Sequence, residues 1–153
     1  MRIERLPIED VKEILTRCKV IAVVGVSRDS SKDSYRVAEY LRKHGFHIIP
    51  VNPSADEILG KKTYKSLINI PKKIQKTLEI VDIFRPSAEV LPVVEQAVQL
   101  KESYDVPYVI WMQLGIVNEQ AGEVARKAGL TVVMNKCMMQ EHRKLLPEDK
   151  EKQ

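Results

Sequence analysis

The chain has 153 residues, of which 44% are hydrophobic and 30% charged, and this is the composition of one ordinary globular domain rather than of a disordered segment. Its formal net charge is +4, from 25 Lys and Arg against 21 Asp and Glu, and the basic residues are dispersed among acidic ones. Nucleic acid is therefore an unlikely partner, because a dedicated RNA- or DNA-binding face concentrates its basic side chains.

The N-terminal region carries acidic residues and lacks the continuous apolar core of a signal peptide. No apolar run approaches the roughly 18 residues of a membrane span, so no membrane association is expected. The two cysteines, Cys18 and Cys137, form no metal-binding or redox spacing. We therefore expect a cytoplasmic protein with no metal site and with both thiols reduced.

Helix and strand patterns alternate along the chain. Helical periodicity predicts helices over 7–17, 33–44, 87–103, 118–127 and 137–146, and a helical turn at 66–70. Apolar, β-branched runs predict strands over 19–27, 46–51, 79–84, 107–112 and 130–134, with a short strand at 62–64. The expected N-caps are Asp33 or Ser34, Ser87 and Asn118.

Short links between alternating strands and helices are typical of a parallel sheet covered on both faces. The sequence thus predicts an α/β protein with a three-layer, Rossmann-like, doubly wound parallel sheet. We expect a single domain over residues 1–153, with its core at about 15–145 and a solvated C-terminal tail.

The loop after the first strand has the composition of an anion-binding site. Ligands of such sheets bind outside the carboxyl ends of the strands, at the point where the strand order reverses. Gly25 permits a tight turn, hydroxyl groups and cations follow it, and the helix start near Tyr35 offers unpaired N–H groups. An ordinary polar surface loop is the alternative interpretation. The side chains expected to serve a phosphate are those of Ser27, Arg28, Ser30, Lys32 and Arg36.

Two absences argue against an NAD dehydrogenase, whereas a phosphate on the ribose would be tolerated better because no carboxylate repels it. The loop is not GxGxxG, and the second strand ends in Val51, Asn52 and Pro53, where an NAD site places an acidic residue for the ribose. An NAD(P)-dependent oxidoreductase, or another nucleotide-using enzyme, nevertheless remains the main alternative function.

Further candidates follow the later strands. Arg85, after Phe84, either contacts a phosphate or carboxylate or forms a salt bridge with Asp82 or Glu89. At the end of the next strand, Trp111 is expected in the core, whereas Gln113 is expected to face the cleft. No catalytic constellation is recognisable, because no nucleophile lies near a histidine and no GxSxG motif occurs.

Cys137 lies where the last strand gives way to a helix, beside Lys136. Both a helix N-terminus and a nearby cation favour the thiolate, so thiol exchange with a ligand is one interpretation. The alternative is a small hydrophobe that packs against Met134 and Met138.

Six segments together resemble a known family: GVSRDSSKDSYRVAEYL, IIPVNP, EILGKKTYKSL, VDIFR, VIWMQLGIVNEQA and AGLTVVMNKC. They are similar to the stand-alone CoA-binding proteins of bacteria and archaea and to the N-terminal CoA-binding domain of the succinyl-CoA synthetase α subunit. The resemblance covers about residues 15–145 and implies a CoA-binding Rossmann-like fold. The contacts to CoA that it implies fall on Gly25, Val26, Ser27, Arg28 and Ser30, on Val51, Asn52 and Pro53, and on Met112, Gln113 and Leu114.

The chain departs from the synthetase domain in three respects. Its first loop has fewer glycines, and Ala55 stands where the synthetase has a lysine, a role that Lys61 or Lys62 would have to fill. The domain with the catalytic histidine has no counterpart. The resemblance therefore implies non-catalytic binding of coenzyme A or acyl-CoA, as a carrier, sensor or regulatory subunit, with a homodimer or a partner enzyme as possible associations.

Overall fold

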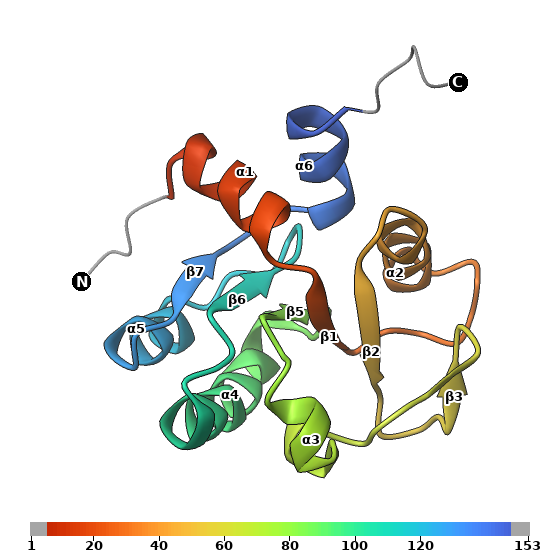
Figure 1. Ribbon diagram of the computed structural model, residues 1–153, viewed down its shortest axis with the longest axis horizontal. Helices are drawn as coiled ribbons and strands as arrows, with labels where there is room; N and C mark the ends of the chain where they lie inside the picture. The colour runs from red at the N-terminus through yellow and green to blue at the C-terminus, as the bar shows by residue number, and fades with distance from the viewer. Residues whose placement is uncertain (1–5, 148–153) are drawn as a thin grey trace.

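A five-stranded parallel sheet forms the centre of the computed structural model, which describes residues 6–147 (Figure 1). Its strand order is β2-β1-β5-β6-β7, and every neighbouring pair is parallel. The predicted doubly wound sheet is thereby confirmed, whereas the predicted tail beyond residue 147 lies outside the described residues. The strands are β1 (Val20–Val24), β2 (His47–Val51), β5 (Ile80–Ile83), β6 (Val109–Met112) and β7 (Thr131–Val133).

Helices cover both faces of this sheet and complete the three layers (Figure 1). One face carries α1 (Ile8–Arg17), α2 (Asp33–Lys43) and α6 (Met138–Leu145). The other carries α3 (Lys72–Gln75), α4 (Val90–Tyr104) and α5 (Glu119–Lys127). None of the helices in the described part of the chain is both long and apolar enough to cross a membrane.

Successive side chains of each strand point to opposite faces of the sheet, so the core consists of two clusters, one on each face. In β1, Ile21 and Val23 pack with the α1, α2 and α6 side chains, whereas Ala22 and Val24 pack with those of α4 and α5. All four side chains are less than a tenth exposed. A strand buried on both faces cannot tolerate polar positions on either, which is why the strand runs are almost wholly apolar.

A small hairpin, β3 (Glu57–Ile58) and β4 (Lys61–Lys62), follows β2. Leu59 and Gly60 turn it with positive φ angles of 56° and 69°, as a two-residue hairpin loop requires. The predicted strand at 62–64 was therefore wrong in its bounds, although Tyr64 forms an isolated parallel bridge to Val51. The helical turn predicted at 66–70 is confirmed as a 3-10 helix over Leu67–Asn69, and α3 was not predicted.

One of the three predicted N-caps is correct. Asn118 caps α5 by accepting a 2.9 Å hydrogen bond from the N–H of Ala121. Helix α2 is instead preceded by Lys32 without a side-chain cap, and Ser34 accepts a hydrogen bond from the N–H of Ser27. Ser87 begins a 3-10 turn ahead of α4, and its hydroxyl accepts from the N–H of Val117. Both serines thus satisfy loop amides rather than helix amides.

Candidate functional site

The strand order reverses between β1 and β5, because the chain passes from β1 to β2 on one side and then to β5 on the other. Gly25, with φ of +90°, follows β1 at this switch point. A Cβ atom there would lie 2.6 Å from the carbonyl oxygen of Phe84 and 3.0 Å from Cδ of Arg85. Only glycine allows the loops after β1 and β5 to approach this closely.

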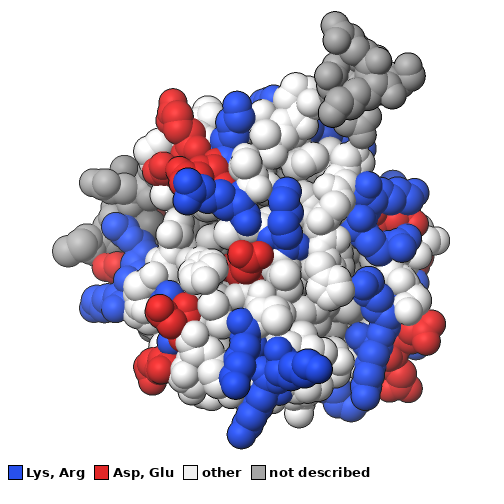
Figure 2. Space-filling model, in the orientation of Figure 1, with Lys and Arg blue, Asp and Glu red and all other residues white. Residues whose placement is uncertain are grey.

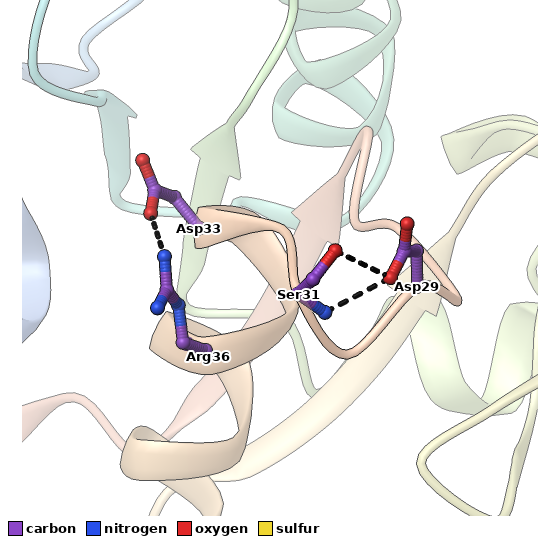
Figure 3. Close-up of polar contacts among 4 residues, drawn as sticks. All are labelled: Asp29, Ser31, Asp33 and Arg36. Carbon is purple, nitrogen blue, oxygen red and sulfur yellow. Dashed lines mark hydrogen bonds and ion pairs between the residues drawn. The ribbon is translucent and has the colours of Figure 1, made fainter.

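Internal hydrogen bonds hold the loop between β1 and α2. The hydroxyl of Ser27 accepts from the N–H of Asp29 at 3.0 Å. The carboxylate of Asp29 accepts from both the N–H and the hydroxyl of Ser31, at 2.9 and 2.7 Å (Figure 3). These bonds, from the backbone first and the side chain second, lower the pKa of Asp29. The hydroxyls of Ser27 and Ser31 therefore order the loop.

The start of α2 keeps unpaired backbone donors. Arg36 donates its N–H to the carbonyl of Lys32, but the N–H groups of Asp33, Ser34 and Tyr35 have no acceptor within residues 6–147. Helix N-termini attract anions through such groups and through the helix dipole. The exposed Arg28 forms no ion pair among the described residues, whereas Arg36 pairs with Asp33 at 2.6 Å (Figure 3).

Asn52 joins the loop after β2 to the loop after β1. Its side-chain amide donates a 2.9 Å hydrogen bond to the carbonyl of Val26, and its Oδ1 accepts from the N–H of Ser54 at 2.7 Å. The side chains of Val26 and Val51 are buried in the core, so only their backbone faces the edge of the sheet. Pro53 is exposed on the same turn.

A pocket of about 150 Å³ lies on the α4 side of the switch point. Arg85 lines it and pairs with Glu89 at 2.6 Å. The salt bridge expected for this arginine is therefore present, with Glu89 and not Asp82 as its partner. Lys65 lines the same pocket and donates to the carbonyl of Pro53 at 3.2 Å. The sequence interpretation missed Lys65, since it named Lys61 and Lys62, which lie on β4 and do not line this pocket.

A larger pocket, of about 650 Å³, lies between α2 and α6 on the opposite side of the switch point. It brings together four residues that the sequence analysis singled out at three separate strand ends: Phe84, Gln113, Leu114 and Cys137. Met112 does not join them, because its side chain is fully buried in the core on the α4 and α5 side. The sequence interpretation missed the contribution of Tyr40 and Arg143, which no strand-end motif marks.

A buried polar pair underlies this α2–α6 pocket. Gln113, only 2% exposed, donates a 2.6 Å hydrogen bond to the fully buried carboxyl group of Asp82 and accepts a 3.4 Å bond from the N–H of Met138. The second oxygen of Asp82 has no partner among the described residues. Burial raises the pKa of Asp82 to about 7, although the bond from Gln113 opposes this shift. Gln113 thus lines the pocket as predicted, in an orientation that Asp82 and α6 determine.

Trp111 lies in the core as expected, and Cys137 packs in the core beside Met138 but not beside Met134. Trp111 is fully buried, and its indole N–H donates to the carbonyl of Lys136 at 2.8 Å. Cys137 is 8% exposed and belongs to the same core cluster as Met138, although it also lines the α2–α6 pocket. Met134 packs in the other cluster, on the far side of the sheet.

Comparison with known proteins agrees with this geometry. Residues 19–143 match the model of the CoA binding domain family. An uncharacterized protein of Bacillus subtilis, YneT, is 40% identical over 133 residues, which are 87% of this chain and 92% of that protein. The solved structure of a hypothetical protein from Pyrococcus horikoshii is 41% identical and superimposes with a TM-score of 0.83, over 95% of this chain and 99% of the other.

The same fold occurs as a small part of larger enzymes. An ADP-forming acetate–CoA ligase of Archaeoglobus fulgidus is 39% identical over 62 residues, which are 39% of this chain but only 9% of the ligase. An acetyl-coenzyme A synthetase from Ca. Korarchaeum cryptofilum superimposes with a TM-score of 0.63 at 28% identity, over 78% of this chain and 26% of the synthetase. From the family match over most of its length and from the shared sheet, we conclude that the chain belongs to the CoA-binding domain family.

Proposed function

We propose that this protein binds coenzyme A or an acyl-CoA over the carboxyl ends of β1, β2, β5 and β6, without catalysing a reaction itself. The observation that carries the proposal is the geometry of the switch point. First-turn N–H groups of α2 and the side chain of Arg28, which have no partner within residues 6–147, lie beside a glycine with no space for a side chain. The membership of the CoA-binding domain family supports CoA as the ligand.

In this proposal the phosphates of CoA lie at the start of α2 and over the α4-side pocket. Arg28 and Lys32 supply charge at the first place, and Lys65 and Arg85 at the second. The Arg85–Glu89 pair is partly exposed, and exposed ion pairs contribute little stability, so Arg85 can exchange Glu89 for a phosphate at small cost. Ser30 and Tyr35 lie within reach of the same ligand through the loop and the helix start.

The contacts of Asn52 count against an NAD-dependent oxidoreductase as the alternative. An NAD site holds the ribose hydroxyls with a carboxylate after the second strand. Here that position holds Asn52, whose amide is bonded to Val26, and the turn offers no carboxylate to repel a ribose phosphate. CoA carries such a phosphate, so the turn after β2 suits CoA better than NAD.

The α2–α6 pocket is the place for the other end of the ligand. Cys137 lines it, so the thiol of CoA would come close enough for thiol–disulfide exchange with the Cys137 side chain. The protein would then act in the cytoplasm as a carrier, a sensor or the regulatory subunit of a partner enzyme. Lys and Arg side chains are interspersed with Asp and Glu on the face shown in Figure 2, which does not favour RNA as the ligand.

Native mass spectrometry of the purified protein tests the proposal. The expected spectrum shows the chain with one bound CoA or acyl-CoA, or acquires that mass when CoA is added to the free chain. A chain that remains unliganded when CoA is added, at concentrations where a member of the same family becomes liganded, would contradict the proposal.

A further inference from the structure

The α2–α6 pocket is an open groove with an apolar floor. Helices α2 and α6 both begin at the carboxyl edge of the sheet and line the groove from there. Val37, Phe84, Leu114 and Met139 supply its apolar surface, and Leu114 is 59% exposed. An exposed leucine on the rim of a concave apolar surface can pack against the apolar part of a ligand bound in that groove.

One cation on this groove has no carboxylate partner among the described residues. Arg36 and Lys43, on α2, pair with Asp33 and Glu39 at 2.6 and 4.0 Å. Arg143, on α6, lies over the ring of Tyr40, with 4.8 Å from Cζ to the ring centroid, and forms no ion pair within the described part of the chain. Within residues 6–147, the groove therefore presents the positive charge of Arg143, without a carboxylate partner, beside an aromatic ring.

The distance from Cys137 to Arg143 sets the length of an acyl chain that could start beside the cysteine and reach the arginine. Arg143 follows Cys137 by six residues along α6, and six residues of helix rise about 9 Å. Helical side chains lean toward the helix N-terminus, so the guanidinium group lies nearer to Cys137 than its own Cα atom does. A short acyl chain that starts beside Cys137 could place its far end at Arg143.

We propose that the α2–α6 groove holds the acyl group of an acyl-CoA and selects a dicarboxylic acyl group, whose free carboxylate pairs with Arg143. This inference rests on the proposed function and specifies the class of its ligand. The apolar floor contacts the methylene groups, and Arg143 contacts the terminal carboxylate through charge-assisted hydrogen bonds.

The test compares glutaryl-CoA with pentanoyl-CoA, whose acyl chains are equally long and differ in the terminal carboxylate. Calorimetry of the whole chain is expected to show about tenfold tighter binding of glutaryl-CoA, since a hydrogen bond to a charged group is worth about that factor. Arg143→Gln is expected to abolish the difference and to leave the affinity for CoA itself unchanged. Arg143→Lys, which retains the charge, is expected to retain part of the preference.

Lys144→Gln is the matched control, because Lys144 is the next residue on α6, pairs with Glu141 and does not line the groove. It is expected to behave as the unchanged protein does. Equal affinities for the two acyl-CoAs, or a preference that survives in Arg143→Gln, would overturn the inference while CoA binding stands. Failure of CoA itself to bind would instead contradict the proposed function, and the inference with it.

Discussion

The side-chain amide of Gln113 donates a 2.6 Å hydrogen bond to the carboxyl group of Asp82, which is fully buried on the neighbouring strand. The other oxygen of Asp82 has no partner in the described part of the chain. A buried charge with an unsatisfied oxygen is costly, so this carboxyl group favours its protonated form. The pair lies beneath the α2–α6 groove, and it connects the stability of the core to the orientation of a groove-lining amide.

The stability of the protein should therefore decrease as the pH rises from about 4 to about 7. The pKa of Asp82 is raised to about 7 in the folded state, whereas it is near 3.9 in an unfolded chain. The folded protein retains a proton that the unfolded chain releases, so this contribution is present below about pH 4 and is lost by about pH 7, at a cost of up to about 4 kcal/mol. Urea unfolding at about pH 5 and about pH 8 measures the difference.

Asp82→Asn is the matched variant for this prediction, because it keeps the shape and an acceptor for Gln113 but does not titrate. Its unfolding free energy should change less between the two pH values than that of the unchanged protein. If both proteins show the same pH dependence, another group causes it.

Gly25→Ala should destabilise the fold strongly and weaken CoA binding. The added Cβ would meet the backbone oxygen of Phe84 at 2.6 Å, so the loops after β1 and β5 would have to separate. Gly45→Ala is the control, since Gly45 has the same φ of +90° with no atom within 4 Å of the added Cβ. Gly45→Ala should cost about 1–2 kcal/mol from the backbone conformation alone, and Gly25→Ala more. Denaturant unfolding of both variants would contradict this account if the two costs were equal.

Arg28→Ala should weaken CoA binding and leave stability almost unchanged. Arg28 is exposed and forms no ion pair among residues 6–147, so folding does not depend on it. Loss of a charge-assisted bond to phosphate is expected to cost about 1.5–3 kcal/mol of binding free energy. Arg126→Ala, which removes an exposed arginine from α5, should leave calorimetric affinity as it was. Equal affinities of the two variants would remove Arg28 from the site.

Cys137 should form a mixed disulfide with CoA when the protein is incubated with CoA disulfide. The Cys137 thiolate attacks one sulfur of the disulfide, one CoA leaves as its thiolate, and the other stays bonded to the protein. Cys18 lies at the other edge of the sheet, and its pKa is raised to about 11, first by burial and then by Glu79, so it should react poorly. Intact mass should show an adduct that is lost in Cys137→Ser and retained in Cys18→Ser. The opposite mapping, or no adduct, would leave a purely non-covalent binder.

Much of the sheet could be predicted from sequence because its strands are buried on both faces and read as continuous apolar runs. The first strand was predicted too long, since Gly25 ends β1 at Val24 by turning the chain with a positive φ. The helix caps were harder to predict. Ser34 and Ser87 have the residue type of a cap, but their hydroxyls accept from the loop amides of Ser27 and Val117. Those partners are set by tertiary contacts that no local pattern reveals.

The sequence predicted that the site lies at the carboxyl edge of the sheet, but it did not predict that the site comprises two separate pockets. Strand ends identified Phe84, Arg85 and Gln113, because the carboxyl ends of parallel strands meet at one edge. The consecutive residues Phe84 and Arg85 nevertheless line different pockets. Lys65 lines the α4-side pocket because its neighbour Tyr64 forms a β-bridge to Val51. This bridge joins two segments that the β3–β4 hairpin separates in the sequence. Such contacts depend on the path of the chain and leave no motif.

Thermal unfolding with CoA, NAD and NADP in parallel tests the central claim most directly. Ligand at a hundred times its dissociation constant adds about 2.7 kcal/mol of stability, which is a rise of roughly 5–10 °C in Tm for a domain of this size. We expect this rise with CoA and none with NAD, because the turn after β2 has no carboxylate to hold the 2′-hydroxyl of the adenosine ribose of NAD. Equal shifts with CoA and NAD, or a shift with NAD alone, would contradict it.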